Sequence, residues 1–150
     1  MMQKEPLKDG TIEAYRAGYK DLDRIWSVLS KTCGLSDAEY WSLLMIREGA
    51  LTQHEISERL FMSKQTVNSA FRQLVKKGLV RLKAQEDNLR VKQIVLTEEG
   101  ERFSRQYIDD MLRLEERVWM ELPAEERVLL TRLTRKYNGL LNAELQKHLK

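Results

Sequence analysis

Side chains that can donate and accept hydrogen bonds recur on one side of the segment SKQTVNSAFRQLVKKGLV. On a helical wheel of 3.6 residues per turn, the apolar side holds Val67, Ala70, Phe71, Leu74 and Val75. The other side holds Gln65, Thr66, Ser69, Arg72 and Lys76. Such amide, hydroxyl and guanidinium groups match base edges and phosphates in a major groove. Ser63–Gly78 contains no carboxylate, which would repel a polyanion. The segment therefore predicts a helix that contacts nucleic acid.

The charge of the chain is unevenly distributed. The 150 residues carry a net charge of +3, which by itself is weak support for a nucleic-acid partner. Thr52 to Thr97 contains nine basic and four acidic residues, a net +5, and the remainder is −2. This asymmetry is typical of a chain in which only the middle part faces phosphates.

Helix signals precede and include this basic part. The first helix is expected from about Thr11 to Lys31, closed by Gly34. Its apolar seam has 3-4 spacing and consists of Ile12, Tyr15, Tyr19, Leu22, Trp26 and Leu29. Ser36 with Glu39, and Thr52 with Glu55, have capping-box spacing and begin two further helices. Ser63 caps the helix described above, which Gly78 ends.

The pattern then changes to that of a β-hairpin. The runs LVRLKA at 79–84 and VKQIVLT at 91–97 alternate, and the polar QEDNLR separates them. Two short helices followed by a two-stranded ribbon predict a winged helix-turn-helix in a mainly α chain with a small β wing.

Two more helices are expected after the hairpin. Thr97 caps a long one, and Pro123 stands in the first turn of the last, which runs toward Leu149. The expected division is residues 1–34 and 98–150 for dimerisation helices and 35–97 for the DNA-binding domain.

The predicted DNA contacts fall into four groups. The N-terminus of the helix before the recognition helix offers free N–H groups to a phosphate, and a wing arginine suits the negative potential of the minor groove. The major-groove residues are Ser63, Gln65, Thr66, Asn68, Ser69 and Arg72. The phosphate contacts are Lys64, Lys76, Lys83 and Lys92, the helix-start residues are Thr52, Gln53 and His54, and the minor-groove residue is Arg90.

The order LSDAEYWSLLMI, LTQHEISERL, SKQTVNSAFRQLVKKGLV, wing, VLTEEG resembles the MarR family of bacterial transcription regulators. The most specific parts are KKGLV and LTEEG. The family's wing carries Asp-x-Arg. Here Asn88-Leu89-Arg90 stands at that place, with Asp87 one position early. The resemblance therefore assigns Arg90 to the minor groove.

The resemblance implies an obligate homodimer that binds double-stranded DNA at a short inverted repeat. Its two recognition helices would meet major grooves roughly 34–36 Å apart. Family members are typically repressors that small aromatic or phenolic ligands, oxidation or metals relieve. Residues for such a ligand pocket are Tyr15, Tyr19, Trp26, Tyr40 and Trp41. The alternative is that these aromatic side chains only fill the core and the dimer seam.

Two alternative functions remain open at this point. Cys33 could sense oxidants, although it stands at a helix end beside Gly34 rather than within the first helix. A winged helix could also bind protein instead of DNA.

Other classes of function find little support. No nucleophile–base pair, phosphate-binding glycine loop or metal-ligand spacing occurs, so neither an enzyme nor a bound cofactor or metal is expected. A single cysteine, no apolar run of membrane length and no signal peptide favour a cytoplasmic protein.

Overall fold

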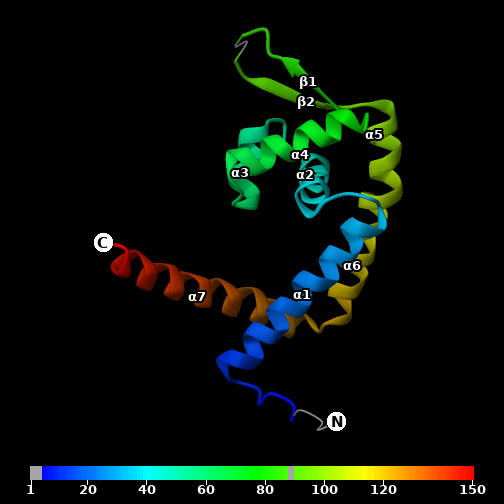
Figure 1. Cartoon of the computed structure of the whole chain (residues 1–150). Helices are drawn as coiled ribbons and strands as arrows, with labels where there is room; N and C mark the ends of the chain where they lie inside the picture. Colours follow the sequence, from blue (N-terminus) through cyan, green and yellow to red (C-terminus); the bar gives the residue numbers. More distant parts are fainter. Residues whose placement is uncertain (1–4, 88–89) are drawn as a thin grey trace. The chain divides into compact units, whose positions relative to one another are not determined.

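The computed structural model describes residues 5–87 and 90–150 of a mainly helical chain (Figure 1). The chain forms two compact units, Met1–Ile108 and Asp109–Lys150. The first unit contains α1 (Ile12–Thr32), α2 (Asp37–Arg47), α3 (Gln53–Leu60), α4 (Lys64–Lys76), β1 (Val80–Ala84), β2 (Lys92–Leu96) and α5 (Glu98–Phe103). A π-helical turn, η1 (Ser104–Asp109), leads into the second unit, which contains α6 (Asp110–Glu121) and α7 (Ala124–His148). β1 and β2 pair antiparallel, so the predicted helical fold with a two-stranded wing is confirmed.

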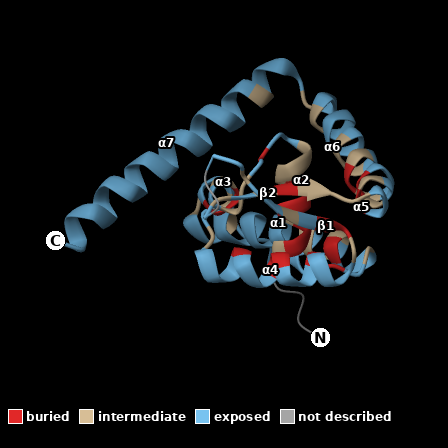
Figure 2. Ribbon diagram, turned by 90° about the horizontal axis from the view of Figure 1, so that it is seen from above, coloured by how far each residue is buried: buried red, intermediate tan, exposed pale blue. Residues whose placement is uncertain are grey.

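The core of the first unit lies between α2, α3 and α4 (Figure 2). Tyr40, Leu43, Ile56, Phe71 and Leu74 are each at most 1% exposed. The prediction that Val75 is buried with them is wrong, since its side chain is 44% exposed. Val75 lies about 100° round the helix from Leu74, at the edge of the apolar side.

The N-terminal caps predicted from the sequence are present. Ser36 and Glu39 form a reciprocal capping box at the start of α2. The hydroxyls of Thr52, Ser63 and Thr97 each accept a hydrogen bond from the backbone N–H three residues later. These bonds satisfy backbone donors that have no partner within the helix and so fix where α3, α4 and α5 begin.

The segment LTEEG joins the end of the wing to the end of α4. The Thr97 hydroxyl donates to the carbonyl of Gly78 at 2.5 Å and accepts from the N–H of Gly100 at 2.9 Å. The Thr97 N–H donates to the Leu79 carbonyl at 3.1 Å. Gly100 is buried, and a Cβ there would stand 1.8 Å from the Leu79 carbonyl oxygen. Glycine is needed at this position because two backbone segments meet there.

The expectations for the last two helices need correction. One long helix was expected from Thr97, but η1 separates α5 from α6. A π turn bonds each residue to the fifth along rather than the fourth, which inserts one residue and interrupts the regular ladder. Pro123 is the N-cap of α7, with an extended ψ of 149°, and not part of its first turn.

Within the described residues, no helix is both long enough and apolar enough to cross a membrane.

Candidate nucleic-acid interface

The polar side of α4 faces solvent along its whole length. Ser63, Lys64, Gln65, Thr66, Asn68, Ser69, Arg72 and Lys76 are all exposed. Because Val67, Phe71 and Leu74 are buried against α2 and α3, the helix cannot rotate to hide this side. The helix contains no acidic residue, so the exposed side presents hydrogen-bonding groups and positive charge only.

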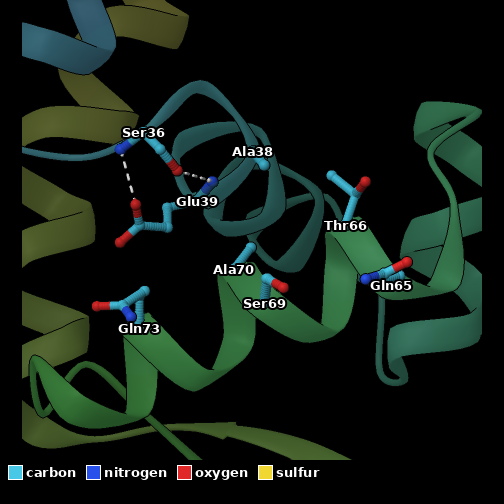
Figure 3. A pocket seen from close by; sticks show the side chains of 8 residues that line it. All are labelled: Ser36, Ala38, Glu39, Gln65, Thr66, Ser69, Ala70 and Gln73. Atoms are coloured by element: carbon cyan, nitrogen blue, oxygen red, sulfur yellow. Dashed lines mark hydrogen bonds between the residues drawn. The ribbon is translucent and has the colours of Figure 1, made fainter.

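A groove separates this side of α4 from the first turn of α2 (Figure 3). Its volume is about 450 Å³. Gln65, Thr66, Ser69 and Gln73 line it from α4, and Ser36 is among the residues that face them from α2. Gln73 was not among the predicted contacts. Its spacing of four residues from Ser69 places it on the same face, so the wheel contained the signal for it.

A second groove, of about 250 Å³, lies on the other flank of α4 toward α3. Gln53 and His54 from the start of α3 face Lys64 and Asn68 from α4 across it. Two of the predicted helix-start residues therefore share this groove with one predicted phosphate contact, Lys64, and one predicted major-groove residue, Asn68. α4 stands as a ridge between two grooves, the form needed for a helix that enters a DNA groove while neighbouring elements reach the backbone on each side.

The start of α3 is fixed to the wing by backbone hydrogen bonding. Ile94 donates its N–H to the Leu51 carbonyl at 2.8 Å, and Thr52 forms an antiparallel bridge with Gln93. His54 is held by its neighbour Glu58, with 3.2 Å between Nε2 and the carboxylate oxygen. The helix-start residues and the wing thus belong to one continuous surface.

The strand register divides the predicted wing contacts between two faces. Lys83 pairs with Gln93 and Arg81 with Val95, whereas Lys92 pairs with Ala84. Since paired residues share a face and neighbours alternate, Lys83 lies with Arg81 and Lys92 lies on the opposite face. Arg90 is exposed at the tip. The preceding Asn88 and Leu89 of the wing motif lie outside the described residues.

An ion pair between a solvent-accessible lysine and a buried carboxylate connects the end of α4 to the start of α2. The Lys77 ammonium donates to the Glu39 carboxylate at 2.5 Å and to the Gly34 carbonyl at 3.2 Å. The Glu39 side chain is only 4% exposed, and that of Lys77 is 37% exposed. Burial raises the pKa of Glu39, but hydrogen bonds from Lys77 and Ser36 and the charge of Lys77 outweigh it, so the pKa lies below its ordinary value. One lysine therefore helps to set the position of α4 against the end of α1 and the start of α2.

Replacement of Lys77 by methionine is expected to lower the free energy of unfolding at pH 7 by about 2 kcal/mol. This is below the usual 3–5 kcal/mol for a fully buried pair because solvent reaches the lysine. Because the pKa of Glu39 is depressed in the folded protein, its ionised carboxylate stabilises the fold at pH values above the ordinary pKa of 4.5. That stabilisation is lost as the pH falls through the depressed pKa. The deficit of Lys77→Met should therefore shrink below about pH 4.5. Urea unfolding of the wild type and of Lys77→Met at several pH values measures this difference in unfolding free energy.

Lys76→Met is the matched control for that experiment, because it removes the same charge from the adjacent, exposed position. It should change the unfolding free energy by less than about 0.5 kcal/mol. Equal losses in the two variants, or a Lys77→Met deficit that does not depend on pH, would contradict the assigned role of the ion pair.

The residues proposed for an effector pocket are only partly brought together. The rings of Trp26 and Trp41 lie 5.1 Å apart and are half-buried, and Tyr40 meets Trp41 edge-on at 6.0 Å. Tyr40 is 1% exposed and belongs to the core. Tyr15 and Tyr19 are 45% and 58% exposed on α1.

Cys33 lies at the end of α1, where its thiol donates to the Ser30 carbonyl at 3.2 Å. Burial raises the pKa of this thiol, although backbone hydrogen bonds at Leu35 and Cys33 and the charge of Lys77 partly oppose the effect. A raised pKa keeps the thiol protonated, which lowers its reactivity toward oxidants.

Comparison with solved structures finds the same fold in several proteins. A MarR protein from Peptoclostridium difficile is 21% identical, with 96% of this chain and 95% of that one covered and a TM-score of 0.69. A MepR–DNA complex from S. aureus is 19% identical, with 84% and 94% covered and a TM-score of 0.67. A MarR transcriptional regulator from Methanosarcina mazei is 19% identical, with 87% and 96% covered and a TM-score of 0.64. Comparison of the sequence with curated proteins finds no match.

The ridge of α4, the helix-turn-helix that supports it and the adjoining ribbon define a winged helix-turn-helix protein. Residues 34–90 match the model of the MarR family, so this part of the chain is similar in sequence to that family. The resemblance noted from the sequence is thereby confirmed.

Proposed function

We propose that this protein regulates transcription by binding double-stranded DNA as a homodimer. The observation that carries the proposal is the acid-free, exposed side of α4 between its two grooves. Groups of that kind suit base edges, and we expect residues on either flank to contact the two DNA backbones. MepR, which shares the fold, was solved bound to DNA, which supports the same use of the fold here.

The dimer is proposed from apolar side chains that the single chain leaves in water. Tyr15, Tyr19 and Leu22 on α1 are each 45–58% exposed. α7, which is described over its whole length, has no buried residue, although it carries Leu129, Leu133, Leu140 and Leu141. Apolar surface this extensive is rarely left exposed in a protein that acts alone. A second copy of the chain would cover it and present two recognition helices to an inverted repeat.

Repression and its release by an effector complete the proposed mechanism. A bound dimer at a promoter would block transcription. A small aromatic or phenolic ligand near Trp26 and Trp41 would act close to the junction of α1 and α2, to which Lys77 connects the recognition helix. Quenching of tryptophan fluorescence by phenolic acids would report such a ligand. The raised pKa of Cys33 gives no support to the alternative of a redox sensor.

Arg72→Ala and Arg90→Ala are each expected to weaken operator binding about tenfold or more, the usual value of a well-placed arginine contact to a base or narrow groove. The operator would come from the DNA beside the gene or from selection on random duplexes. Fluorescence anisotropy measures the affinity, which should also fall with salt by about 0.9 log units per phosphate contact for each tenfold rise.

Arg24→Ala is the control for these variants. It removes the same charge from α1, where Arg24 is paired with Asp21 at 2.8 Å, and should leave the affinity unchanged. Wild-type affinity in both Arg72→Ala and Arg90→Ala would refute the docking. Binding of a protein but of no duplex would identify an adaptor instead.

A further inference from the structure

Phe61, in the turn between α3 and α4, is the most exposed of the large apolar side chains in the described residues. Its side chain is 96% exposed, and the next, Leu149, is 75% exposed. A phenylalanine in water contributes nothing to the core, so the folded chain itself does not explain this ring.

The backbone at Phe61 makes the residue type more unusual. Phe61 ends α3 in the left-handed conformation, with φ 52° and ψ 38°. Its neighbour Met62 donates to the Ser57 carbonyl at 3.1 Å, the bond expected when a helix ends in this way. Among the described residues, every other position with positive φ is a glycine, and Phe61 is the one exception. An aromatic side chain is strained where glycine is relaxed, so neither packing nor local geometry favours phenylalanine.

The position of Phe61 suggests what the ring contacts. It lies two residues before Ser63, the N-cap of α4, and three before Lys64, which lines the groove toward α3. In a helix-turn-helix the first helix crosses the DNA backbone and the N-terminal end of the second enters the major groove. The turn that joins them must therefore pass the edge of that groove.

We infer that Phe61 is an apolar DNA contact, which packs against a deoxyribose or a thymine methyl group at the edge of the major groove. This inference rests on the proposed DNA binding. Phenylalanine is one of the side chains suited to a thymine methyl, and deoxyribose presents a similar apolar surface. The ring would be removed from water when DNA binds. A strained backbone such as that at φ 52° is typical of residues kept for a functional contact rather than for stability of the fold.

Phe61→Gly tests the inference because its effects on stability and on affinity should differ in direction. Glycine relieves the strained φ, so the melting temperature should stay unchanged or rise by a few degrees. The affinity for the operator duplex should fall about tenfold, since a half-buried aromatic contact is lost. Phe61→Tyr, which keeps the ring, should bind like the wild type. Leu7→Ala removes another exposed apolar side chain, remote in sequence from the turn, and should change neither property.

Operator DNA with deoxyuridine in place of thymidine separates the two possible contacts. Weaker binding of the wild type but not of Phe61→Gly would identify a thymine methyl, and no change in either would identify the deoxyribose. Equal affinity of Phe61→Gly and the wild type would overturn the inference and leave the proposed function intact. A lower melting temperature in Phe61→Gly would also overturn it, by showing a structural role. Failure of the wild type to bind any duplex would overturn both.

Discussion

Exchange of Leu133 for lysine is expected to convert the proposed dimer into a monomer and to weaken binding to the full operator about a hundredfold or more. Leu133 is 48% exposed in the middle of the apolar face of α7. A second copy that covers this face would have to bury two ammonium groups in place of two leucine side chains, which is strongly unfavourable. Each monomer would then keep its own winged helix-turn-helix intact. It would lose the gain of about 10²–10⁴ in affinity that comes from linking two DNA-binding units in one molecule.

Sedimentation velocity and anisotropy on the same samples measure the two effects together. Thr131→Lys is the matched control, because it introduces the same charge on the opposite side of α7, where the Thr131 hydroxyl bonds only to carbonyls of its own helix. That variant should remain dimeric and bind normally. A wild-type protein that sediments as a monomer at micromolar concentration, or a dimeric Leu133→Lys variant with full affinity, would refute the proposed dimer.

Gly100→Ala is expected to lower the free energy of unfolding by about 3 kcal/mol or more, at the upper end for overpacked positions. The new Cβ would meet the oxygen, carbon and Cα of Leu79 at 1.8, 2.8 and 3.2 Å. All three are backbone atoms, so no side chain can turn aside to make room. The first turn of α5 would have to move, and the bonds from Thr97 to Gly78 and Leu79 would be lost. Denaturant unfolding measures the change.

Gly139→Ala provides a control of opposite sign for that measurement. Gly139 lies within α7, and a Cβ there meets nothing within 4 Å. Alanine should therefore stabilise the helix by about 0.5–1 kcal/mol through its higher helix propensity. A loss of similar size in both variants would show that the destabilisation of Gly100→Ala does not arise from the contact with Leu79.

The sequence by itself determined the parts of the fold that depend on near neighbours. The caps at Ser36, Ser63 and Thr97 were predicted because each hydroxyl acts on an amide three residues away. The wing followed from alternation, and the exposed face of α4 from its 3.6-residue period. The sequence was less informative where a helix departs from the regular 3.6-residue period or where a residue lies at the edge of its apolar side. The π turn after α5 and the exposure of Val75 were not predicted, because neither changes the spacing of apolar residues by much.

The candidate site needed the tertiary structure wherever partners are far apart in sequence. Only the strand register separates Lys83 from Lys92, since a shift of one residue would exchange the two faces. Packing also brings Lys77 to Glu39, 38 positions away, and places Gly100 against Leu79. The polar, acid-free side of α4 could thus be predicted from local chemistry. The grooves that flank it, the ion pair that positions it and the exposure of Phe61 depend on how distant segments pack, which no local pattern encodes.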